Sequence, residues 1–179
     1  ASNEKVENLM TITSFQEKDN LEKRQNEESK IISENIDISG KKIIEIGCGL
    51  GRWAKFFQDK CEIYLGVDNA QNLIKLANDN YKYENCFFQE ISALNIDINK
   101  LKIKPPFDIV FITGLLIYLN DEDIDSLIKQ INKLVSKDKQ VYIRETVSVM
   151  GTRLTLKDFY SDALQSEYNA IYRNSEELL

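Results

Sequence analysis

The 179-residue sequence contains no histidine. Histidine is the most common general base in enzymes and the most common metal ligand in proteins, so this chain must do without it in both roles. Any proton transfer would have to use an aspartate, glutamate, tyrosine, lysine or cysteine side chain. We therefore expect no metal site of the usual histidine-containing kind, and none of another kind is indicated.

Cysteine is also scarce, and the three that occur, Cys48, Cys61 and Cys86, form no Cys-x-x-Cys pair. Each lies in or beside an apolar segment that we expect to be buried. Free thiols in a reducing compartment are the simplest interpretation of this pattern. The cysteines therefore favour a cytoplasmic protein.

The sequence lacks any apolar run near the roughly 20 residues that a membrane-spanning helix needs. Residues 1–30 are polar and contain no apolar signal-peptide core. The net charge is −6, and an acidic chain is poorly suited to binding nucleic-acid phosphates. We expect a small-molecule partner, with no nucleic acid and no membrane, and both a monomer and a homodimer remain open.

What is present fits an ordinary globular domain, with 29% charged and 42% hydrophobic residues. Apolar segments of strand length alternate with helical patterns, which predicts an α/β fold with a parallel sheet covered on both faces. The expected strands span residues 43–46, 62–67, 86–90, 107–113 and 140–143. The expected helices span residues 71–80 and 121–135, and another begins near residue 50.

The most informative stretch is Ile-Ile-Glu-Ile-Gly-Cys-Gly-Leu-Gly at residues 43–51. A β-branched run ends at Gly47, Gly49 and Gly51, and a helical pattern follows. Glycines let the backbone approach a ligand where a Cβ would collide, and a helix N-terminus offers unpaired N–H groups. Glu45 lies inside the strand, where a carboxylate needs hydrogen-bond partners. We expect it to hold the glycine loop or a ligand ammonium.

The glycine spacing distinguishes two kinds of cofactor site. A dinucleotide-binding oxidoreductase would place its third glycine at position 52, where this chain has Arg52. The observed Glu-x-Gly-x-Gly-x-Gly instead resembles motif I of the class I S-adenosylmethionine-dependent methyltransferases. Taken alone, the stretch is also compatible with a strand-to-helix turn that binds nothing.

The resemblance covers about residues 43–146, and the stretch at 107–119 is similar to the family's fourth strand and the loop after it. It implies a doubly wound, Rossmann-like sheet in the order 3-2-1-4-5. It also implies S-adenosylmethionine as cofactor and S-adenosylhomocysteine as product, with the glycines and Thr113 around the methionine moiety. The expected cofactor contacts are Arg24, Glu45, Gly47, Cys48, Gly49, Gly51, Asp68, Asn69, Glu90, Ile91, Thr113 and Gly114.

Asp68 ends the second expected strand, about 20 positions after Gly47, where an acidic residue can bind a ribose. A carboxylate accepts two hydrogen bonds, and a vicinal diol offers two. The alternative is that Asp68 or Asn69 caps the next helix. By the resemblance, Glu90 would accept from the adenine amino group and Ile91 would pack on the ring, although Glu90 could equally be a solvated strand end.

Methyl transfer asks the protein mainly to align a nucleophile and exclude water, because the sulfonium carries its own leaving group. Many small-molecule members of the family have a histidine where this chain has Tyr118. Tyr118 and Glu145 are therefore the candidate bases for a hydroxyl acceptor. Arg144 and Glu145 follow the fifth strand and are expected on the substrate side, with a surface ion pair as the alternative.

Two patterns indicate the acceptor. No Asn-Pro-Pro-Tyr or Asp-Pro-Pro-Tyr run, frequent in amino-methylating nucleic-acid enzymes, follows the fourth strand. Arg-x-Thr-Leu-Lys-x-Phe-Tyr at 153–160 and Ala-Ile-Tyr-Arg at 170–173 resemble methyltransferases of bacterial surface-polysaccharide clusters. We expect a small acceptor such as a sugar or polysaccharide precursor. An NAD(P)-dependent oxidoreductase and a non-catalytic cofactor-binding module are the alternatives.

Three segments are expected along the chain. Residues 1–39 form a polar arm with a helix at about 20–35, either a lid that contacts the ligand through Phe15 and Arg24 or a cover for a sheet edge. Residues 40–146 form the cofactor-binding core, and residues 147–179 an irregular or helical flap on the acceptor side. The family's usual C-terminal strand hairpin is expected to be missing. The fifth strand would then be a bare edge, unless the flap covers it, a second chain pairs with it or the natural chain is longer.

Overall fold

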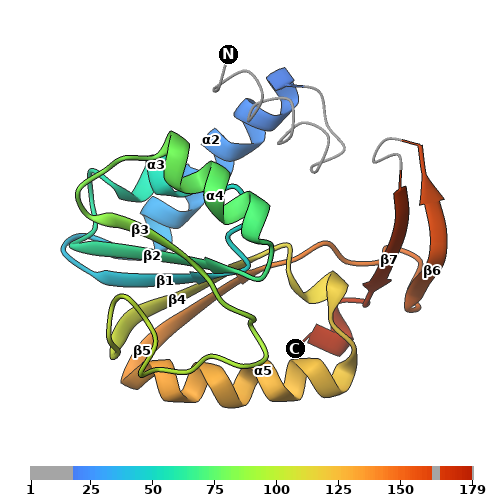
Figure 1. Ribbon diagram of the computed structural model, residues 1–179. Coiled ribbons are helices and arrows are strands. Elements are labelled where there is room, and N and C mark those ends of the chain that lie inside the picture. Colours follow the sequence, from blue (N-terminus) through green and yellow to red (C-terminus); the bar gives the residue numbers. More distant parts are fainter. Residues whose placement is uncertain (1–17, 163–165, 179) are drawn as a thin grey trace.

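The computed structural model describes residues 18–162 and 166–178. Five parallel strands form one sheet in the order β3-β2-β1-β4-β5, with helices on both faces (Figure 1). The predicted doubly wound α/β fold and its strand order are confirmed. The strands are β1 (Lys42–Ile46), β2 (Ile63–Asp68), β3 (Cys86–Glu90), β4 (Phe107–Thr113) and β5 (Val135–Arg144).

Two apolar layers, one on each face of the sheet, make up the core. Successive strand residues point to opposite faces, so Ile43 joins the cluster under α2, α3 and α4, whereas Ile44 joins the cluster against α5. Both side chains are fully buried, as expected for a parallel sheet covered on both sides. The helices are α2 (Lys18–Asn35), α3 (Ala54–Phe57), α4 (Gln71–Asn80) and α5 (Asp121–Leu134).

The helix after the glycine turn is shorter than the sequence predicts. Residues 49–53 are turns, and α3 has only four residues. Trp53, Phe56 and Phe57 nevertheless pack on one another, with ring centroids 5.1–6.3 Å apart. Their helical spacing therefore indicated an aromatic cluster that a single turn can build. A helix of four residues has little dipole, so α3 does not provide the helix N-terminus that was expected to bind the ligand.

The junction between α5 and β5 also differs from the prediction. α5 begins at a capping box, in which the Asn120 side chain accepts from the Asp123 N–H at 2.8 Å. It ends at Leu134 rather than residue 135. β5 starts at once at Val135, where residue 140 was expected, and pairs with Phe107 across an irregularity in the β4–β5 ladder.

The prediction that residues 147–179 hold no strand pair is wrong. β6 (Leu154–Ser161) and β7 (Ser166–Tyr172) form an antiparallel hairpin. A bulge between Leu156 and Phe159, with Asp158 at φ 50°, interrupts the two-residue alternation of β6 and hid it in the sequence. A short 3-10 helix, η2 (Glu176–Leu178), follows the hairpin.

This hairpin forms a separate two-stranded sheet and does not extend the main one (Figure 1). It packs on η1 (Leu116–Tyr118), the 3-10 turn after β4, where Tyr168 and Ala170 contact Ile117. Within the part of the chain that the structure describes, β5 pairs only with β4. The β5 side chains of Val141 and Ile143 are 43% and 51% exposed, so the predicted bare edge remains.

α2 is the described portion of the N-terminal arm. Its Ile32 is fully buried in the core cluster, whereas Ile31 is 54% exposed, so the helix packs through a narrow stripe. Phe15, one of the two predicted lid contacts, lies outside the described residues. Neither α2 nor any other helix of the described ranges is long and apolar enough to cross a membrane.

Candidate functional site

A cavity of about 870 Å³ opens where the parallel strands end. Its walls come from the glycine loop after β1, the ends of β2 and β4, the loop after β3, and parts of α2, η1 and β7. Such a crevice at the carboxyl ends of the strands is the usual ligand site of open α/β sheets. All of the predicted cofactor contacts except Gly51 and Glu90 line it.

Gly51 and Glu90 lie elsewhere. A Cβ on Gly51 would stand 2.3 Å from Cε1 of Phe88, so this glycine allows the loop to pack closely against the core. Glu90 is exposed and borders a neighbouring hollow, which shares Ile91 and Ser92 with the main cavity. The structure therefore places Ile91 on the cavity wall and turns Glu90 toward solvent.

Asp68 ties the glycine loop to the start of α4. Its carboxylate accepts from the backbone N–H of Gly49 and from that of Ala70, both at 2.9 Å. The alternative that Asp68 or Asn69 caps this helix is wrong, because the N-cap of α4 is Ala70 and no side chain caps it. Each carboxylate oxygen of Asp68 retains a second acceptor site, so the interpretation as a ribose ligand stays open. The side chain lines the cavity beside Asn69.

Glu45 is buried at the cavity floor with the partners that its position requires. The Tyr64 hydroxyl donates to one carboxyl oxygen and the Thr113 hydroxyl to the other at 3.3 Å. Trp53 Nε1 in turn donates to the Thr113 hydroxyl at 3.3 Å. Burial raises the pKa of Glu45 to about 7, against the lowering effects of the Tyr64 hydrogen bond and the positive charge of Arg52. The carboxyl therefore titrates near neutral pH.

This titration predicts a pH dependence of stability. The pKa of Glu45 rises from 4.5 to about 7 on folding, so between these values the folded chain keeps a proton that the unfolded chain releases. The stabilisation is complete below pH 4.5 and is lost as pH rises to about 7, by about 3 kcal/mol. Denaturant unfolding from pH 4.5 to 8 should show this loss in the wild type. Glu45→Gln should remove that component, and identical slopes for both proteins would contradict the assignment.

Three arginines meet one carboxylate at the edge of the cavity. Glu28, whose side chain is 13% exposed, is contacted by Arg24 Nε at 3.0 Å, Arg52 Nη2 at 3.5 Å and Arg144 Nη2 at 2.8 Å. All of these arginines line the cavity. The ion-pair partner of Arg144 is thus on α2, so the surface pair considered for this residue does not form with Glu145.

Tyrosines form the wall toward the hairpin. The hydroxyls of Tyr168 and Tyr172 lie 2.8 Å apart, and the ring of Tyr118 meets that of Tyr168 edge-on at 6.1 Å. All three line the cavity. Burial raises the pKa of Tyr118 above that of a free phenol, as it does for Tyr168. Tyr118 and Tyr168 are therefore neutral hydrogen-bonding phenols at physiological pH.

Glu145, the other candidate base, faces the backbone rather than the cavity. Its carboxylate accepts from Leu116 N at 2.5 Å and from Thr146 N at 2.8 Å. Burial raises the pKa of Glu145 above the ordinary value. These contacts hold η1, which carries Tyr118, so the geometry favours a positioning role.

The cysteines add no chemistry. All three are free and buried. Cys48 lines the cavity, where burial raises the pKa of its thiol well above the ordinary value and leaves it a neutral wall. Among the residues that the structure describes, no three His, Cys, Asp or Glu side chains gather to hold a metal ion.

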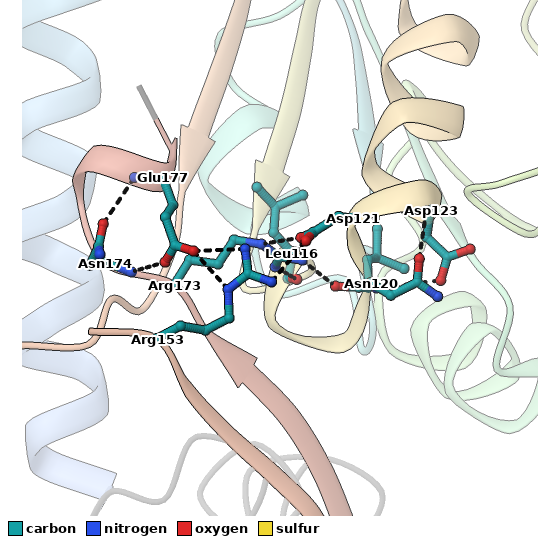
Figure 2. A network of polar contacts seen from close by, with 9 residues as sticks. Leu116, Asn120, Asp121, Asp123, Arg153, Arg173, Asn174 and Glu177 are labelled. Atoms are coloured by element: carbon teal, nitrogen blue, oxygen red, sulfur yellow. Dashed lines mark hydrogen bonds and ion pairs between the residues drawn. The ribbon is translucent and has the colours of Figure 1, made fainter.

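The sequence patterns did not predict the role of Arg173, which joins the hairpin to η1 (Figure 2). Its side chain is 3% exposed and donates to the carbonyls of Leu116 at 3.0 Å and Leu119 at 2.8 Å. It also pairs with Asp121 at 2.7 Å, and Arg153 reaches the other oxygen of that carboxylate at 2.8 Å. The two arginines belong to the segments 153–160 and 170–173 noted above. Together with Asp121 they form a structural clamp that holds the hairpin in place.

Comparison with known proteins identifies the family. The family described as a methyltransferase domain matches residues 43–138, more than half of the chain. The chain belongs to this family. The predicted membership of the class I S-adenosylmethionine-dependent methyltransferases is thereby confirmed.

Relatives of this chain differ in what they are named for. Phosphoethanolamine N-methyltransferase 1 of Triticum aestivum is 31% identical over 111 residues, which cover 60% of this chain and 22% of the relative. Ribosomal RNA small subunit methyltransferase A of Mesomycoplasma hyopneumoniae is 29% identical over 123 residues, covering 60% of this chain and 46% of the relative. The chain spans less than a quarter of the length of the plant relatives it matches.

A solved structure supports the fold. Phosphoethanolamine N-methyltransferase 1 of Haemonchus contortus, in complex with phosphoethanolamine and S-adenosylhomocysteine, superposes with a TM-score of 0.62 at 21% identity, covering 82% of this chain and 31% of that one. A second solved neighbour is also a complex with S-adenosylhomocysteine, at 16% identity, and at such identities both neighbours show the fold alone. The acceptor does not follow from the family, because the relatives' named acceptors range from a small phosphoamine to ribosomal RNA.

Proposed function

We propose that this chain transfers the methyl group of S-adenosylmethionine to a small-molecule acceptor. The observation that carries the proposal is the convergence of Asp68, Glu45 and Gly49 on one cavity. They supply a carboxylate for a ribose diol, a buried carboxyl for an ammonium, and an open position where a Cβ would meet no atom within 4 Å. The cofactor itself supplies a methyl group on a sulfonium leaving group.

The remaining cavity residues fit the parts of the cofactor. We assign the methionine part to Gly47, Thr113 and Gly114, and the adenine to Asn69 and Ile91, which line the far end of the cavity. A volume of about 870 Å³ lies in the upper part of the range for small-molecule sites and suits a cofactor together with a small acceptor. In this proposal the arm at 1–39 acts as a lid and residues 147–179 wall the acceptor side.

The acceptor would lie against Tyr118, Tyr168 and Tyr172. Tyrosine side chains offer hydroxyls and flat faces, which fit a hydroxyl-rich molecule such as a sugar or polysaccharide precursor. The same ring faces would also suit an amine of the kind for which the plant relatives are named. The protein's part in either case is alignment and exclusion of water, with Tyr118 as the hydrogen-bond partner of the nucleophile.

Titration with S-adenosylhomocysteine tests the cofactor site. Asp68→Ala should weaken binding by about 1.5–3 kcal/mol, because hydrogen bonds to a charged group are lost. That is a loss of roughly tenfold to 150-fold. Calorimetry on both proteins measures it, with the exposed Glu84→Ala as matched control. If Asp68→Ala bound S-adenosylhomocysteine with unchanged affinity, the assignment of Asp68 to the ribose would be contradicted.

Two further outcomes separate the alternatives. Binding of NAD in place of S-adenosylhomocysteine would favour an oxidoreductase. Binding of S-adenosylhomocysteine without methyl transfer to any of a panel of sugars, sugar phosphates and amines would favour a non-catalytic module. Formation of S-adenosylhomocysteine from S-adenosylmethionine, dependent on one acceptor of the panel, is the result that the proposal predicts.

A further inference from the structure

Positive charge is in excess at one edge of the cavity. Arg24, Arg52 and Arg144 share the single carboxylate of Glu28, so three positive charges face one negative charge there. The side chains of Arg52 and Arg144 are only 20% and 22% exposed. Charges withdrawn from water in this way need a counter-charge.

Arg52 and Arg144 both show that this arrangement is energetically unfavourable. Burial lowers the pKa of Arg52, and the positive charge of Arg144 acts in the same direction. Nε of Arg144 is buried and has no hydrogen-bond partner in the described part of the chain. A buried donor without a partner is unfavourable, and native structures rarely keep one unless a ligand or water satisfies it.

The cofactor does not provide the missing negative charge. S-adenosylmethionine combines a carboxylate, an ammonium and a sulfonium and is therefore a net cation at neutral pH. Its carboxylate can engage one arginine, which we assign to Arg24 on α2. In the described part of the chain neither of the other cavity carboxyls forms an ion pair with these arginines, since Glu45 is hydrogen-bonded to Tyr64 and Thr113, and Asp68 to two backbone N–H groups.

Arg144 lines the cavity beside the end of β4. Its register partner is Thr113, and its carbonyl accepts from Gly114 N at 2.9 Å. Thr146, two positions further along the chain, also lines the cavity. A guanidinium in this place is suited to hold an oxyanion of a molecule bound next to the cofactor.

We propose that the methyl acceptor carries a phosphate or carboxylate group, and that Arg144 together with Arg52 binds it. The inference rests on the proposed function, because it assigns the chemistry of the molecule that shares the cavity with the cofactor. Glu28 then serves as an internal counter-ion, which holds the arginines together until the acceptor anion arrives.

The test uses the full chain saturated with S-adenosylhomocysteine and titrated with inorganic phosphate or with acetate at constant ionic strength. Arg144→Gln should bind the preferred anion at least tenfold more weakly, with affinity for S-adenosylhomocysteine within about twofold of the wild type. Arg144→Lys, which keeps the charge without the planar fork, should fall in between. Arg153→Gln, outside the cavity and bound to Asp121 and Glu177, is the control and should change neither affinity.

Glu28→Gln makes the opposite prediction. It removes the internal competitor for the arginines, so the anion should bind about three- to tenfold more tightly. A purely structural cluster would instead lose anion binding in both Glu28→Gln and Arg144→Gln. If Glu28→Gln does not fold, the Arg144 variants decide the question.

The outcomes separate this inference from the function on which it rests. A wild type that binds S-adenosylhomocysteine but neither phosphate nor acetate overturns the inference alone. An equal loss of S-adenosylhomocysteine affinity in Arg144→Gln also overturns it, because Arg144 would then serve the cofactor carboxylate. A wild type that does not bind S-adenosylhomocysteine contradicts the proposed function itself. Preference for phosphate over acetate, or the reverse, identifies which oxyanion the acceptor carries.

Discussion

Gly49→Val is expected to reduce S-adenosylhomocysteine affinity by at least 100-fold while leaving a folded protein. Gly49 has φ +52°, and a Cβ built on it meets no atom within 4 Å, because it would point into the cavity. Valine would place three carbon atoms in that space and strain the backbone by about 1–2 kcal/mol. Strain of that size lowers the melting temperature without unfolding the domain.

Gly51→Ala is the control from the same motif. Its Cβ would stand 2.3 Å from Phe88 Cε1, inside the core, so this variant should lose stability and show a weaker, indirect effect on binding. Calorimetric titration and thermal melting of both variants measure the contrast. Normal binding by Gly49→Val would mean that the glycine loop serves the fold alone.

Arg173→Leu is expected to have the largest effect on stability. The substitution removes the donors to the Leu116 and Leu119 carbonyls and the partner of Asp121 (Figure 2). Losing buried charged hydrogen bonds of this kind costs about 3–5 kcal/mol. For a chain of this size the melting temperature should fall on the order of 10 °C. Differential scanning calorimetry measures both values.

Arg153→Leu provides the matched control for this clamp. Arg153 binds the same Asp121 carboxylate, but its side chain is 36% exposed against 3% for Arg173. Exposed ion pairs contribute about 0–1 kcal/mol, so the control should change stability little. Equal losses in both variants would show that burial of Arg173 is not what stabilises the docked hairpin.

The cofactor half of the cavity could be predicted because its signals are local. Gly49 and Asp68 stand at the ends of two strands, and parallel strands that are neighbours bring their carboxyl ends together. The hydrogen bond between these residues follows from that arrangement. Gly49 and Gly51, in contrast, look alike in the motif, and only their surroundings separate a cavity position from a core position.

The contacts of Arg144 and Arg173 could not be predicted because they join distant segments, although Arg144 itself was expected on the substrate side. Arg144 forms an ion pair with Glu28, which lies on a helix more than 100 positions away in the sequence, and no local pattern predicts such a pair. Similarly, Arg173 reaches Asp121 only because the hairpin folds back onto η1. The bulge at Asp158 interrupts the alternation of β6, so this strand was not recognised in the sequence.

A crystal structure of the chain soaked with S-adenosylhomocysteine tests the central claim most directly. The account predicts the homocysteine part along Gly47 and Gly49, the ribose hydroxyls within hydrogen-bond distance of Asp68, and the adenine on Ile91. A parallel soak with NAD should leave the cavity without nucleotide. Ordered S-adenosylhomocysteine outside this cavity, or NAD inside it, would contradict the account.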